Sequence, residues 1–102
     1  MIHEVLMFGE ENAIPGKTLV EMRGLKDVRD LTRIVEQERR AGHPICATTD
    51  YKNPGYFLAE TPEDLEKYID SLDRRLKNIR LTREACQETL LRMSGQEQIG
   101  VD

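Results

Sequence analysis

The sequence predicts an α+β fold that is mostly helical, with three short helices, a β-hairpin and then one long C-terminal helix. Three observations support this order. Two stretches with apolar residues at helical spacing are separated by Gly24, turn residues are dense between Ile45 and Leu58, and neither Gly nor Pro occurs from Glu63 to Ser94. The chain of 102 residues has room for one small domain with an appendage. We expect a domain over residues 1–60, a helix over 61–94 and a flexible tail over 95–102.

The first two short helices follow from apolar spacing and from their boundary residues. The segment 2–8 is expected to form a helix with one buried face, made of Ile2, Val5, Leu6 and Phe8. A second helix is expected to start at Pro15-Gly16 and to end at Gly24. Its apolar side consists of Leu19, Val20 and Met22.

The third helix has clear signals at both ends. Asp27 is suited to cap its N-terminus, and Gly42 followed by Pro44 is suited to end it. Between them, four apolar residues recur at helical spacing and predict the buried face: Val28, Leu31, Ile34 and Val35.

A hairpin is expected next. Ile45 and Ala47 alternate with Cys46 and Thr48, as in a half-buried strand, and Tyr56 and Leu58 alternate with Phe57 in the same way. The loop between these strands, residues 50–55, is rich in turn residues. The order of helices and hairpin is the layout of a winged helix-turn-helix.

The long helix is predicted from Thr61, which can cap it, and from Pro62, which suits its first position. Along it runs a heptad seam, interrupted at Arg83, which predicts a coiled coil and therefore a homodimer. The alternative is that the first part of the seam, up to Leu76, only covers the small domain. The expected dimerisation residues are Leu65, Ile69, Leu72, Leu76, Ile79, Cys86, Leu90 and Met93.

The region Gly16 to Ala59 resembles the N-terminal winged helix-turn-helix of the biotin operon repressor type. The shared features are Gly16-Lys17-Thr18-Leu19 in the second helix, the capped third helix, and the wing end Gly55-Tyr56-Phe57-Leu58. The sequence departs from that pattern by having Asp27 in place of Ser, Glu38 in place of an apolar residue, and a longer wing. No biotin-binding or ligase region follows, so only DNA binding is implied. The long helix is also similar to dimerising extensions in small phage and mobile-element regulators.

The resemblance implies a contact surface for double-stranded DNA. The N-terminal half of the third helix would face base edges, and helix ends and the wing would hold phosphates. The implied DNA-binding residues are Lys17, Lys26, Arg29, Asp30, Arg33, Gln37, Lys52 and Asn53. The distribution of charge favours this surface, because residues 15–40 carry seven bases against five acids while the whole chain has a net charge of -4.

Other functional classes have less support in the sequence. His43 and Cys46 have metal-ligand spacing but no second close pair accompanies them, and no nucleophile or phosphate-loop motif occurs, so we expect neither a cofactor nor an enzyme. The absence of a long apolar run and of a signal sequence predicts a cytoplasmic protein with reduced thiols and without a membrane partner. A DNA-binding regulator or phage-type factor is the favoured interpretation. The alternative is a non-catalytic protein-interaction module that pairs through the long helix.

Overall fold

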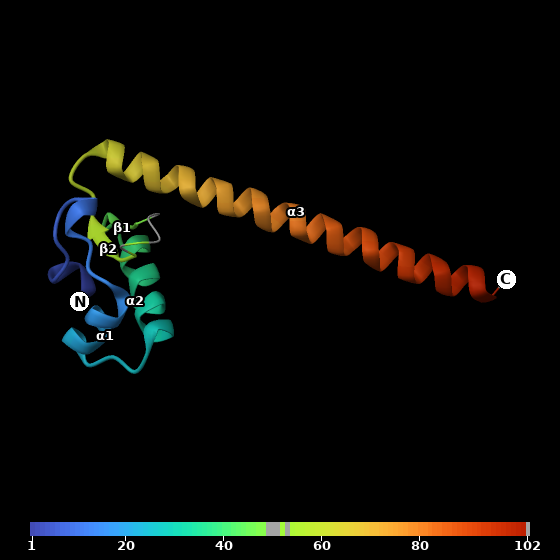
Figure 1. Cartoon of the computed structure of the whole chain (residues 1–102), viewed down its shortest axis with the longest axis horizontal. Helices are drawn as coiled ribbons and strands as arrows, with labels where there is room; N and C mark the ends of the chain where they lie inside the picture. The colour runs from blue at the N-terminus through green and yellow to red at the C-terminus, as the bar shows by residue number, and fades with distance from the viewer. Residues whose placement is uncertain (49–51, 53, 102) are drawn as a thin grey trace. The chain divides into compact units, whose positions relative to one another are not determined.

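The structure is a computed structural model that describes residues 1–48, 52 and 54–101. It is α+β and mostly helical (Figure 1). Two 3₁₀ turns, η1 (Ile2–Glu4) and η2 (Glu10–Asn12), precede the helices α1 (Gly16–Arg23) and α2 (Val28–Arg40). The strands β1 (Ile45–Ala47) and β2 (Tyr56–Leu58) and the long helix α3 (Pro62–Val101) follow. Contacts divide the chain into an N-terminal unit, Met1–Ile69, and a C-terminal unit, Asp70–Asp102.

The two helices α1 and α2 are joined by the short turn that the sequence predicts. Gly24 ends α1 with φ of 60°, a left-handed conformation that glycine adopts without strain. Asp27 caps α2, since its side chain accepts a hydrogen bond of 2.8 Å from the backbone N–H of Asp30. Leu19 from α1 and Leu31 from α2 are fully buried, which packs the two helices against each other.

The strands β1 and β2 form an antiparallel pair in which Cys46 lies opposite Phe57. The hairpin forms where the sequence predicts it, but β1 is not half-buried as expected, because both Ile45 and Cys46 are buried although they point to opposite faces. Ile45 belongs to the core beneath the helix pair, whereas Cys46 and Phe57 pack with Tyr68 from the start of α3. The hairpin is therefore covered on both faces. The expected turn residues Asp50 and Asn53 lie outside the described residues.

The N-terminal segment forms a helix over a much shorter stretch than the predicted 2–8. After η1 the chain becomes extended, and the N–H of Leu58 donates to the Met7 carbonyl at 2.8 Å. Phe8, which was expected to be buried, bridges Leu58 through its backbone and is 58% exposed. Hydrogen bonding to β2 thus replaces further helical turns.

A second extended contact lies just before α1. Ile14 and Tyr56 exchange two backbone hydrogen bonds of 2.9 Å, so the returning strand is flanked on both edges. Gly55 allows this approach, because a Cβ at that position would lie 2.7 Å from the Ile14 carbonyl oxygen.

The main core of the N-terminal unit contains residues from η1, both helices and β1. Val28 and Met22 were expected in it, but they are 48% and 51% exposed. The buried members are Ile2, Leu6, Leu19, Leu31, Val35 and Ile45.

The helix α3 begins as the sequence predicts. The N–H of Asp64 donates to the Thr61 hydroxyl at 3.3 Å, and the N–H of Glu60 donates to the Asp64 carboxylate at 2.9 Å. The helix continues through Gly95 to Val101, beyond the expected end at Ser94. A single Gly costs a helix only about 1 kcal/mol, so it need not end one. Among the described residues, no helix is long and apolar enough to cross a membrane.

Candidate nucleic-acid interface

The solvent-facing side of α2 carries a row of arginines. The side chains of Leu31, Val35 and Glu38 are buried, which fixes the inward face of the helix. Arg29 and Arg33 are one turn apart on the opposite side, and Arg40 lies two turns further along the same side. All three are exposed. We refer to Arg29, Arg33 and Arg40 as the arginine row.

One member of the row is already paired within the helix. An Arg33 Nη donates to the Asp30 carboxylate at 2.7 Å, and this hydrogen bond holds the pKa of the Asp30 carboxyl below its usual value. Arg33 is nevertheless 61% exposed, and solvent weakens such an ion pair. Arg29 and Arg40 form no ion pair with any residue that the structure describes. Positive charge is therefore available at both ends of the row.

The other expected DNA-binding residues lie around α1, the turn and the hairpin. Lys17 is exposed in the first turn of α1, Lys26 is exposed between the helices, and Gln37 is exposed on α2. Lys52 is exposed in the hairpin loop. The expected contact at Asn53 lies outside the described residues.

Two other basic residues in the same region, Arg39 and Arg23, donate hydrogen bonds to backbone carbonyls. The Nε of Arg39 donates to the Ile45 carbonyl at 2.8 Å, and its Nη1 donates to Glu36 at 2.7 Å. Its guanidinium also lies 4.6 Å from the ring centre of Tyr68. Arg23 donates to the Met1 carbonyl at 2.9 Å. Of the bases between residues 15 and 40, these two donate to backbone carbonyls, whereas Arg33 donates to a side chain.

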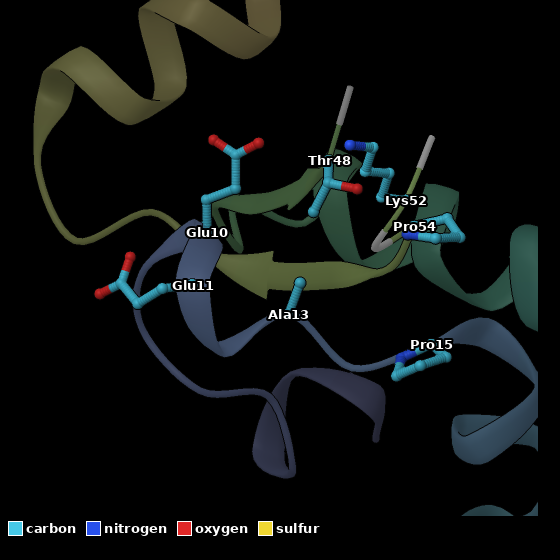
Figure 2. Close-up of a pocket in the computed structure, with 7 residues that line it drawn as sticks. All are labelled: Glu10, Glu11, Ala13, Pro15, Thr48, Lys52 and Pro54. Atoms are coloured by element: carbon cyan, nitrogen blue, oxygen red, sulfur yellow. The ribbon is translucent and has the colours of Figure 1, made fainter. Parts of the chain in front are cut away.

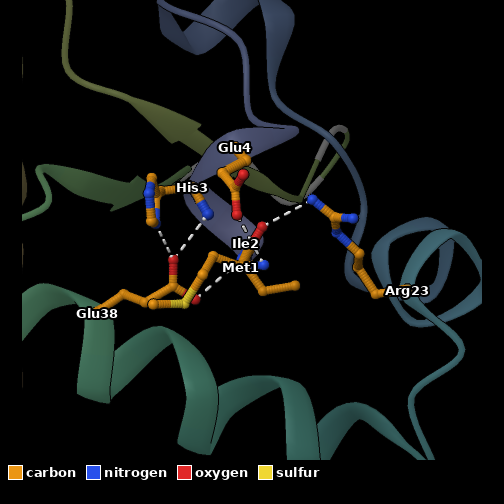
Figure 3. A network of polar contacts seen from close by, with 6 residues as sticks. All are labelled: Met1, Ile2, His3, Glu4, Arg23 and Glu38. Carbon is orange, nitrogen blue, oxygen red and sulfur yellow. Dashed lines mark hydrogen bonds and ion pairs between the residues drawn. The ribbon is translucent and has the colours of Figure 1, made fainter.

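The buried carboxylate of Glu38 explains why α2 directs the arginine row toward solvent (Figure 3). Its oxygens accept hydrogen bonds from the backbone N–H groups of Ile2 and His3, at 2.9 and 2.8 Å, and also contact the His3 ring. The His3 ring stacks on His43 with 3.6 Å between the ring centres. Burial opposes ionisation of Glu38, but the hydrogen bonds from His3 and Ile2 outweigh it and hold its pKa below the usual value.

The sequence signal for this contact was the spacing of Leu31, Val35 and Glu38, which places all three on one helical face. A carboxylate at an apolar position left the register of α2 open, and its partners lie 35 and 36 residues earlier in the chain. The structure shows that Glu38 occupies the core-facing position. The outward position of the arginine row follows from this register.

His43 and Cys46, which have metal-ligand spacing in the sequence, contact different residues in the structure. His43 stacks on His3, whereas the Cys46 thiol lies in the second core cluster, 3.9 Å from the Asp64 carbonyl. Burial and the nearby Asp64 carboxylate raise the pKa of Cys46 to about 11. A thiol held neutral in this way is a packing group.

A cleft of about 450 Å³ lies beside the hairpin (Figure 2). Its lining comes from the segment before α1 and from the hairpin loop, namely Glu10, Glu11, Ala13, Pro15, Thr48, Lys52 and Pro54. Glu10 already pairs with Lys67 at 2.9 Å. The carboxylates of Glu10 and Glu11 would repel phosphate, so the cleft does not extend the arginine row, although Lys52 also lines it.

The predicted dimerisation residues fall into two groups. Leu65 packs partly buried against the Cys46 and Phe57 cluster within the N-terminal unit. The others are exposed, from Leu72 at 38% to Ile79 at 65%. The exposed group is Ile69, Leu72, Leu76, Ile79, Cys86, Leu90 and Met93. Only the start of the seam therefore covers the small domain.

Comparison with protein-family models, curated proteins and solved structures finds no match for this chain. The chain presents an exposed basic face on the second helix of a helix pair, and an exposed apolar seam on a long helix.

Proposed function

We propose that the N-terminal unit is a winged helix-turn-helix that binds double-stranded DNA, and that the C-terminal helix joins two copies in a homodimer. The observation that carries this proposal is the arginine row on the outward face of α2, the second helix of the pair. In helix-turn-helix proteins the second helix enters the major groove, and its N-terminal residues contact base edges.

The position of each residue along α2 suggests its role. Arg29 and Arg33 lie in the first two turns and have the donors to contact guanine in the major groove. Asp30 could accept a hydrogen bond from cytosine once Arg33 turns toward DNA, and Gln37 is placed one turn further along. Arg40 is at the C-terminal end, where phosphate is the nearer target.

The remaining cations would hold the sugar-phosphate backbone. Lys17 is at the start of α1 and Lys26 is in the turn, and both are exposed. Lys52, together with Asn53, would serve the same purpose from the hairpin loop. Such contacts position a protein on DNA without reading its sequence.

Binding of a fluorescent duplex, followed by anisotropy at several salt concentrations, tests the proposal. If Arg29 and Arg33 read bases, Arg29→Ala and Arg33→Ala should each cost about 1–3 kcal/mol at a preferred site. Lys52→Ala should weaken binding to all duplexes about equally and reduce the salt dependence. Arg92→Ala, on the C-terminal unit, is the matched control. Unchanged binding by both α2 variants would reject this recognition face.

A protein-interaction module is the second candidate, and two exposed apolar side chains favour it. Met22 near the end of α1 and Val28 at the start of α2 flank the turn between the helices and are 51% and 48% exposed. The net charge of -4 also opposes general attraction to DNA. Absence of salt-dependent binding to random duplex at low salt would favour this candidate over DNA binding.

A further inference from the structure

The C-terminal unit exposes its seam in a regular pattern. With Leu72, Ile79, Cys86 and Met93 at the d positions of a heptad, the a positions are Leu76, Arg83 and Leu90. The apolar members of this set are all at least 38% exposed. A second copy of the same helix is the partner that matches this seam in length and spacing. The direction in which the two helices pair rests on the homodimer of the proposed function.

Two α3 helices can pair in parallel or in antiparallel direction, and the charges beside the seam distinguish these two arrangements. In this heptad assignment Asp73 and Arg80 lie at e positions, while Arg75 lies at a g position. In a parallel pair, g positions approach e positions of the partner helix, whereas in an antiparallel pair e approaches e and g approaches g. Charges at these flanking positions determine the preferred orientation of coiled coils.

A parallel, in-register pair brings like charges together. Arg83 would lie against Arg83 of the second copy in the centre of the seam, and Arg75 would lie beside Arg80 of the second copy on both sides. The one acidic side chain at an e or g position of residues 70–95 is Asp73, and a parallel pair does not bring it beside either arginine of the second copy. Like charges placed so close disfavour an arrangement.

An antiparallel pair centred between Leu76 and Ile79 avoids both of these contacts between like charges. Leu76 then packs on Ile79 of the second copy, and Arg83 lies over Leu72 of the second copy, away from its own symmetry mate. Arg80 approaches Asp73 of the second copy, and the symmetry of the dimer produces this attractive pair twice. We propose that two copies of this chain associate through antiparallel α3 helices in this register.

Replacement of Arg80 by Asp distinguishes the two arrangements, because it should weaken dimer association in one and strengthen it in the other. In the antiparallel dimer, Arg80→Asp puts a second carboxylate beside Asp73 of the other copy and should weaken association about tenfold, because two attractive pairs become repulsive. In a parallel dimer the same change would relieve the contact with Arg75 and tighten association. Arg74→Asp, which makes the same change of charge on the outer face of the helix, should leave association nearly unchanged.

The double variant Asp73→Arg with Arg80→Asp should restore the association that Arg80→Asp alone weakens. It restores two opposite-charge pairs in the antiparallel register, so its dissociation constant should return close to that of the wild type. Sedimentation equilibrium over a range of protein concentrations measures all four proteins. Tighter association of Arg80→Asp, or failure of the double variant to recover, would overturn the proposed direction.

Disulfide formation under mild oxidation is an independent readout. In the antiparallel register Cys86 faces Ile69 of the second copy, so wild-type protein should not cross-link, whereas Ile69→Cys should form a covalent dimer. In a parallel pair the wild type itself would cross-link through Cys86. Cys46 does not interfere because it is buried. Wild-type cross-linking would reject the direction but keep the homodimer, and a monomeric wild-type protein would reject both.

Discussion

The carboxylate of Glu38 lies at the helix position where the sequence would otherwise call for an apolar side chain, and it is 3% exposed. Its hydrogen bonds to Ile2 and His3 join the beginning of the chain to the last turns of α2. A buried charge is tolerated only when such partners surround it. Glu38 therefore acts as an anchor for the N-terminal segment.

Replacement of Glu38 by Gln should lower the free energy of unfolding at pH 7 by about 2 kcal/mol, because hydrogen bonds to an ionised group are stronger than those to an amide. The folded-state pKa of Glu38 is below the ordinary value of 4.5, so its stabilisation is fully present above that pH. The stabilisation is lost as the pH falls through the folded pKa. Urea unfolding at several pH values measures both effects.

The two proteins should therefore become more alike in stability as the solution is acidified below pH 4.5. Glu84→Gln, on the exposed surface of α3, is the control and should change little at either pH. An undiminished difference between wild type and Glu38→Gln at low pH would show that the contacts of Glu38 do not depend on its charge.

At the scale of elements, the cap of α2 bears directly on the arginine row. The carboxylate of Asp27 accepts the hydrogen bond of the Asp30 N–H at the N-terminus of that helix. Because Arg29 and Arg33 lie in the first two turns, fraying of this end would displace the residues proposed to read bases.

Asp27→Ala should lower the free energy of unfolding by about 1 kcal/mol, as expected for loss of a helix cap. Asp27→Asn retains a side-chain oxygen and should lose much less. Thermal unfolding followed by circular dichroism measures the change. Equal stability of the Ala and Asn variants would indicate that the cap does not contribute.

The elements that the sequence predicts well are those with local signals. Gly24, Asp27 and the Thr61-Pro62 pair act on neighbours within a few residues, and the structure has the expected boundary at each. These features need no knowledge of the rest of the fold.

The features that could not be predicted from the sequence depend on partners that are distant along the chain. Phe8 became part of an extended segment because Leu58 supplies hydrogen bonds from far along the chain. Cys46 is buried because Tyr68 of α3 covers it. Arg29 and Arg33 were predicted as DNA-binding residues, whereas Arg40 was not. The register that directs all three toward solvent depends on Glu38, whose partners could not be read from local spacing.

At the scale of the whole molecule, the seam of α3 is the feature on which the proposed homodimer depends. Leu72 and Leu76 are exposed in the single chain, and burying each is worth roughly 1.5–3 kcal/mol. Two linked copies would also bind two half-sites on DNA with higher overall affinity than one.

The double variant Leu72→Asp with Leu76→Asp should therefore be monomeric at concentrations where the wild type is dimeric, and its affinity for DNA should fall. Leu81→Asp with Leu91→Asp is the matched control, because these leucines are also exposed but lie outside the seam. Sedimentation velocity and duplex binding measure the two properties. A dimeric seam variant, or a monomeric control, would contradict the assigned face.

The side chain of Arg39 connects α2 to three other elements of the N-terminal unit. It extends from α2, holds the carbonyl of Ile45 in β1, and lies over the rings of Tyr56 in β2 and Tyr68 in α3. Three elements are thus clamped by one guanidinium. Loss of this one guanidinium would therefore remove contacts of α2 with β1, β2 and the start of α3 at the same time.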